Sequence, residues 1–157
     1  MLVLILGLSA LFLYNRDSPK FWLLVWPGTV LHEGLHWTVG KVLYAKPMSF
    51  SVLPKEDDSD IIGSVSFSNL NWFNRVPVCM APILGLPLAF ILFHYVPSFE
   101  LWSIQGILIV WIFSAMIASS WPSYVDFEVA SKNTIGWVFW IGLLVLFLYN
   151  KSWQFFG

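Results

Sequence analysis

With 157 residues, of which 58% are hydrophobic and only 11% charged, the chain differs from an ordinary soluble domain, in which about 25% of residues are charged. Its net charge of −1 and the lack of a basic run argue against a nucleic-acid partner, and its single cysteine excludes an internal disulfide or a CxxC redox motif. We therefore expect an integral, multi-pass membrane protein made of one domain, residues 1–157, in contact with the lipid bilayer.

Apolar runs along the chain predict membrane-spanning helices. The first run is short for a span, yet it lacks the basic start and the small-residue cleavage site of a signal peptide. The second contains Pro27-Gly28, which should kink the helix or let it begin afresh. The expected fold class is an all-α membrane protein of about five transmembrane helices with a short β-hairpin in the loop after the second. The spans cover residues 1–14, 21–44, 77–96, 101–121 and 135–149.

The polar segment 45–76, after the second span, contains two stretches that alternate apolar residues with serines. They flank an acidic turn at 54–60. Such alternation predicts a β-hairpin at the membrane surface with a serine face and an apolar face, the latter carrying Phe50, Val52, Val65 and Phe67. Three asparagines follow, for which both capping of the next helix and binding of substrate backbone are possible: Asn69, Asn71 and Asn74.

The second span contains the motif His32-Glu33-Gly34-Leu35-His36. In a helix, positions four apart share one face, so His32 and His36 can direct two imidazole nitrogens at one point while Glu33 holds a water beside it. Hydrocarbon penalises ionisable groups, and a zinc ion bound by both histidines would offset that cost. The alternative, two core histidines satisfied by neighbouring polar groups, does not explain the adjacent carboxylate.

A catalytic zinc site takes three protein ligands and leaves the fourth position open. Pro122-Ser123 should break the fourth span, so that a new turn can present Asp126 on the side of the membrane where the histidines lie. The predicted metal ligands are therefore His32, His36 and Asp126. The remaining candidates point away, lie across the membrane or belong to a polar loop; they are Glu128, His94, Glu100 and the acids of 56–60.

The distribution of lysine and arginine predicts the orientation. Five of these residues fall on the hairpin side of the second span and three on the other side, which places the hairpin and the zinc motif towards the cytoplasm.

These features together resemble the site-2 protease family of intramembrane zinc metalloproteases. The resemblance covers most of the chain in layout and rests on the HExxH motif in a transmembrane helix, a β-rich loop ending in Gly-x-Val, Ala81-Pro82 near the start of the third span, and Asp126 after a proline-containing break. The first motif matches the family residue for residue and implies zinc ligation by the histidines and catalysis by Glu33. The glycine that commonly follows the aspartate is absent, as in a divergent branch.

The expected function is that of a zinc metalloendopeptidase that hydrolyses membrane-protein substrates at or near the cytoplasmic side of the membrane. A transmembrane substrate must unwind before it is cut, and the edge of the second strand, with Gly63, Val65 and Phe67, could pair with it by strand addition. The alternative is a non-proteolytic zinc-binding membrane protein, such as an assembly factor or a transporter. Glu33 favours the enzyme, because a structural site has no evident need for that carboxylate. Neither the oligomeric state nor the substrate's identity has a signal in the sequence.

Overall fold

The computed structural model describes residues 2–15, 22–53, 63–96 and 100–156. Helices dominate these ranges, and two short strands form the only sheet within them. In chain order the elements are α1 (Leu2–Asn15), α2 (Trp22–Val42), β1 (Pro47–Ser51), β2 (Ser64–Phe67), α3 (Arg75–Cys79), the 3₁₀ turn η1 (Ala81–Leu84), α4 (Gly85–His94), α5 (Ile104–Ser119), α6 (Tyr124–Ser131) and α7 (Thr134–Phe156).

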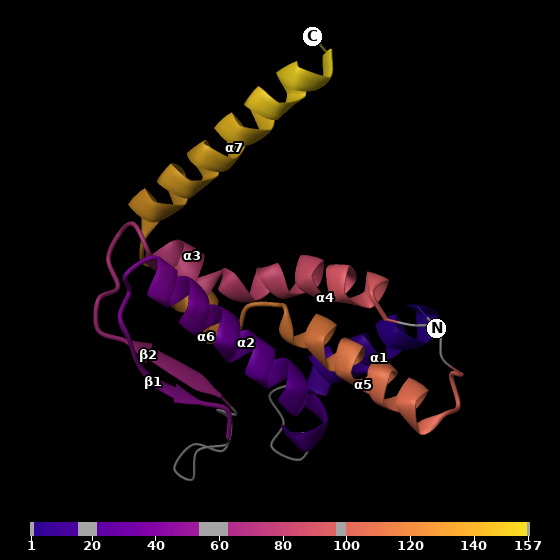
Figure 1. Ribbon diagram of the computed structural model, residues 1–157. Helices are drawn as coiled ribbons and strands as arrows, with labels where there is room; N and C mark the ends of the chain where they lie inside the picture. The colour runs from indigo at the N-terminus through magenta and orange to yellow at the C-terminus, as the bar shows by residue number, and fades with distance from the viewer. Residues whose placement is uncertain (1, 16–21, 54–62, 97–99, 157) are drawn as a thin grey trace.

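The helix that carries the histidine motif, α2, packs against α5 (Figure 1). Small residues allow this close crossing, since a Cβ atom added to Gly28 would collide with the carbonyl oxygen of Ala115 and with Oγ of Ser119. Val25 of α2 and Ala115 are fully buried there. The indole of Trp111 adds a hydrogen bond from Nε1 to the carbonyl oxygen of Leu24, at 2.7 Å. The two helices therefore form a rigid base for the candidate site.

The run 77–96, expected to form one span, is divided into α3, η1 and α4. Pro82 lies at the start of η1, where its missing N–H costs nothing. Gly85 then opens α4 against Ser120, which leaves no room for a Cβ atom. Pro82 also matters for the site. It stands four residues after Val78 and has no N–H, so the carbonyl oxygen of Val78 lacks its usual helical donor and can accept from a side chain.

The predicted β-hairpin is confirmed. β1 and β2 are antiparallel, with Phe50 opposite Val65 and Ser49 opposite Ser66, and the hydroxyls of Ser49 and Ser66 are 2.6 Å apart on the serine face. A register irregularity falls between Pro47 and Ser49. The acidic turn at 54–60 lies outside the described residues.

The asparagines after β2 hold the hairpin to the end of α2. Asn74 is fully buried and donates from Nδ2 to the carbonyl oxygens of Leu43 and Asn69, at 3.2 and 2.9 Å. Asn69 donates to the carbonyl oxygen of Tyr44, at 2.8 Å. Asn71 accepts from the backbone N–H groups that precede α3. All three side chains thus have structural partners, of which those of Asn71 correspond to the expected capping.

The predicted break at Pro122-Ser123 separates α5 from α6, a short helix where the sequence indicated only a new turn. The chain then continues into α7, whose far end extends away from the other elements (Figure 1). Asn133 fixes the near end, where its Nδ2 donates to the carbonyl oxygen of Trp72 at 2.7 Å. Trp140 donates from Nε1 to the carbonyl oxygen of Phe73, at 2.6 Å.

Two stretches of the described chain have the length and apolar composition needed to cross a membrane, Ile104–Ser131 and Thr134–Lys151. Only 6% of the second stretch is buried within the molecule, so its apolar surface is open to a surrounding bilayer. Two further apolar helical stretches, Val3–Asn15 and Ala81–His94, are shorter than a usual span. The five spans, the multi-pass topology and the side on which the site lies stay predictions.

Candidate metal centre

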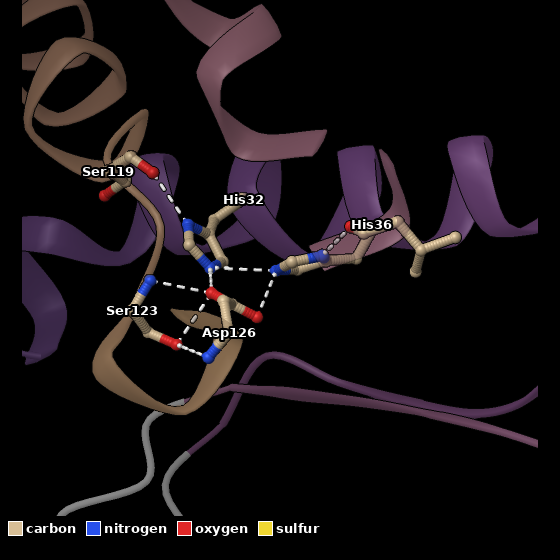
Figure 2. Close-up of polar contacts among 6 residues, drawn as sticks. His32, His36, Ser119, Ser123 and Asp126 are labelled. Carbon is tan, nitrogen blue, oxygen red and sulfur yellow. Dashed lines mark hydrogen bonds and ion pairs between the residues drawn. The ribbon is translucent and has the colours of Figure 1, made fainter. Parts of the chain in front are cut away.

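His32 and His36 lie on the same face of α2, as their spacing predicts, and both are largely buried. Their Nε2 atoms are 3.1 Å apart (Figure 2). The two rings meet nearly edge to face, with an angle of 74° between their planes. Consequently one nitrogen of each ring points at the same small volume beside the helix.

Backbone carbonyls from two other elements orient the rings. Nδ1 of His32 lies 2.7 Å from the carbonyl oxygen of Ser119 at the end of α5. Nδ1 of His36 lies 2.7 Å from the carbonyl oxygen of Val78, near the end of α3. A carbonyl can only accept, so each Nδ1 carries the hydrogen, and in the neutral ring the lone pair is then at Nε2. This is the arrangement found around metal-binding histidines, where a second contact fixes the tautomer.

Asp126 joins the two histidines from the first turn of α6 (Figure 2). Its Oδ2 atom is 3.3 Å from Nε2 of His32, and its Oδ1 atom is 3.1 Å from Nε2 of His36. Ser123 caps the same helix through its side chain, and the Asp126 carboxylate returns a contact to the Ser123 backbone. The break at Pro122-Ser123 therefore brings the carboxylate to the histidines.

The donor set fits a metal ion. Two imidazole lone pairs and a carboxylate repel one another at these separations unless a cation or a shared proton lies between them. In a tetrahedral zinc site with bonds of 2.0 to 2.2 Å, neighbouring ligand atoms are about 3.3 to 3.6 Å apart. The two Nε2 atoms are 3.1 Å apart, and Oδ1 of Asp126 is 3.1 Å from Nε2 of His36, which is slightly below that range. His32, His36 and Asp126 thus form a group that could hold a metal ion.

Glu33 lies beside this group without being part of it. Its side chain is only 7% exposed, and its carboxylate interacts electrostatically with both histidines and with Asp126. Gly63, the residue directly before β2, covers it: a Cβ atom added to Gly63 would lie 2.9 Å from Oε1 of Glu33 and 2.8 Å from Cγ2 of Thr29. The structure therefore places a buried carboxylate between the metal-binding group and the strand.

The other two residues of the expected substrate edge lie further along the hairpin. Phe67 packs against Gly40 of α2, where a Cβ atom would meet its ring. Val65 is half-buried and pairs with Phe50. Because Gly63 contacts Glu33 and Phe67 contacts Gly40, β2 runs along α2 in the same direction.

The remaining ligand candidates do not join the group. Glu128 is exposed and forms an ion pair with Lys132, with Nζ 2.8 Å from Oε1. His94 ends α4, where its ring contacts Tyr95. Glu100 lies before α5, and its carbonyl oxygen accepts from Ser103. The acids of 56–60 lie outside the described residues.

No protein-family model matches the chain, and neither a curated protein nor a solved structure does. The fold and the site therefore define a class of protein. It is mainly helical, has two apolar stretches long enough to cross a membrane, and contains a buried group of two histidines and one aspartate that could hold a metal ion.

Proposed function

We propose that this protein is an intramembrane zinc metalloprotease, which hydrolyses peptide bonds of membrane-protein substrates near the cytoplasmic side of the membrane. One observation carries the proposal: His32, His36 and Asp126 converge as a potential zinc site, and Glu33, which is not needed as a ligand, is buried directly beside them. A structural zinc site is usually closed by four protein ligands, whereas three ligands with an adjacent carboxylate are typical of hydrolases.

Each residue of the site has a role in this chemistry. A zinc ion bound by the three residues would supply Lewis acidity to an attacking water and to the peptide carbonyl. Glu33 takes the proton from the water and transfers it to the leaving amine. The contacts of the histidine Nδ1 atoms with Ser119 and Val78 keep both rings in the tautomer that leaves Nε2 free.

The hairpin gives the proposed enzyme a place for its substrate. A helical segment hides its peptide bonds, so it must unwind, and an extended chain can then pair with a strand edge. Gly63, directly before β2, lies against Glu33, and β2 then follows α2. A segment that pairs along Val65 and Phe67 and continues past Gly63 would therefore pass the carboxylate. The two apolar stretches support a membrane location for both protein and substrate.

Removal of the metal tests the proposed function. Purified protein in detergent should cleave a single-span membrane protein, lose this activity after treatment with a strong zinc chelator, and regain it when zinc is restored. Magnesium should not restore activity, since two imidazoles favour zinc over a hard cation. Cleavage that persists in protein shown to be free of zinc would contradict the proposal.

A substitution at Gly63 separates catalysis from metal binding. Gly63→Ala places a methyl group about 2.9 Å from the Glu33 carboxylate, so this side chain must move. We expect cleavage to fall by at least about tenfold, as small displacements of catalytic groups cost up to about a hundredfold, while zinc content stays the same. Gly34→Ala on α2 is the matched control, because nothing lies within 4 Å of an added Cβ there. Equal activity in both variants would show that Gly63 does not control the position of Glu33.

A further inference from the structure

Ser123 holds one oxygen of Asp126 by two donors. Its backbone N–H lies 2.7 Å from Oδ2, and its hydroxyl lies 2.6 Å from the same atom. The hydroxyl oxygen in turn accepts the backbone N–H of Asp126, at 3.1 Å. The hydroxyl hydrogen must therefore point at Oδ2, since its oxygen already acts as an acceptor towards the backbone.

The two oxygens of Asp126 consequently differ. Oδ2 accepts two short hydrogen bonds from Ser123, and they use the directions in which this atom could bind a cation. Oδ2 also lies 3.3 Å from Nε2 of His32. Oδ1 accepts nothing from Ser123 and lies 3.1 Å from Nε2 of His36, so it is the oxygen with free accepting directions. These contacts also restrict rotation of the carboxylate (Figure 2).

Ser123 and Asp126 form a capping box, and a second serine in the chain shows that a helix is also capped without a carboxylate partner. Ser103 caps α5 with nearly the same backbone angles, φ −71° and ψ 156° against φ −72° and ψ 167° at Ser123. Its hydroxyl accepts the N–H of Gly106, a residue without a carboxylate, at 3.0 Å. A serine alone is thus sufficient to cap a helix in this protein. At α6 the serine also contacts the carboxylate of Asp126, the residue that faces the histidines.

We propose that Ser123 is a positioning residue for the metal centre, which holds Oδ2 of Asp126 so that Oδ1 alone binds the metal. Binding through one oxygen keeps the aspartate from occupying two coordination positions and leaves room for water beside Glu33. This inference rests on the proposed zinc site and concerns metal binding, not the choice of substrate.

The test measures zinc affinity by competition with a chromophoric chelator, using the full chain in detergent. Ser123→Gly removes the hydroxyl, and glycine is well tolerated at the N-cap of a helix. We expect zinc to bind about ten- to a hundredfold more weakly, the usual effect of losing a partner of a metal ligand. Ser123→Thr keeps the hydroxyl and should restore affinity. Ser103→Gly, the matched control at the other end of α5, should bind zinc like the wild type.

The possible results separate this role from the proposed function. Unchanged affinity in Ser123→Gly, or a Ser123→Thr variant as weak as Ser123→Gly, would overturn the role of Ser123 while the zinc site stands. The same loss in Ser103→Gly would also overturn it, because the effect would then belong to capping in general. A wild-type chain that binds no zinc at all would overturn both proposals together.

Discussion

Replacing Glu33 with glutamine is expected to abolish peptide cleavage while leaving zinc in place. Glutamine keeps the shape of the side chain but cannot accept the proton of the attacking water, and loss of a general base costs about a hundredfold or more in rate. Glu33 is not among the three residues that could hold the metal, so zinc content should equal that of the wild type. The measurement is cleavage of a single-span substrate by both proteins, with zinc determined on each.

Two results would contradict the role of Glu33. Equal cleavage by wild type and Glu33→Gln would show that another group is the base. Loss of zinc from the variant would show that Glu33 maintains the metal centre, and its catalytic role would then be unsupported. A wild-type protein that holds zinc and cuts no substrate would favour the non-proteolytic alternative, an assembly factor or transporter.

Removing the Asp126 side chain is expected to cause a large loss of bound zinc. Asp126→Ala leaves two histidines without the negative charge that faces both Nε2 atoms, so zinc should be lost on purification. His32→Ala should lose zinc in the same way. The matched controls are Glu128→Ala, which removes the next acid on the same helix, and His94→Ala, which removes a histidine outside the group. Elemental analysis decides the question, and zinc that depends on Glu128 or His94 would refute the ligand set.

The histidine motif was predictable because it is local. Four residues along one helix fix the relation of His32 to His36, so their convergence needed no knowledge of the fold. Asp126 was predictable less directly, from a proline break and the expected side of the membrane. Glu128 was set aside because, two residues further along the turn, it should point to the opposite face, in agreement with its exposed ion pair.

The groups that orient the ligands could not be predicted in the same way. The carbonyl oxygens of Ser119 and Val78 belong to no motif, since every residue has a carbonyl and tertiary packing decides which one meets a histidine ring. For Val78 one part was visible in the sequence, because Pro82, four residues later, has no N–H to pair with this carbonyl. Ser123 did have a signal, because Ser-x-x-Asp before a helical run is a variant of the capping box.

The hairpin, too, was predictable from the sequence only in part. The alternation of serines with apolar residues predicted a hairpin with Phe50 and Val65 on the same face, because side chains along a strand alternate between its two faces, and the two residues lie opposite each other. The contact of Gly63 with Glu33 depends instead on how the hairpin packs against α2. Only the absence of a side chain at Gly63, which permits that approach, is visible in the sequence.

The central claim is that His32, His36 and Asp126 bind one zinc ion, and anomalous diffraction at the zinc absorption edge tests it most directly. The account predicts a single peak about 2.0 to 2.2 Å from both histidine Nε2 atoms and from Oδ1 of Asp126. A map of zinc-supplemented protein with no peak at these residues, or with the peak bound by other side chains, would contradict it.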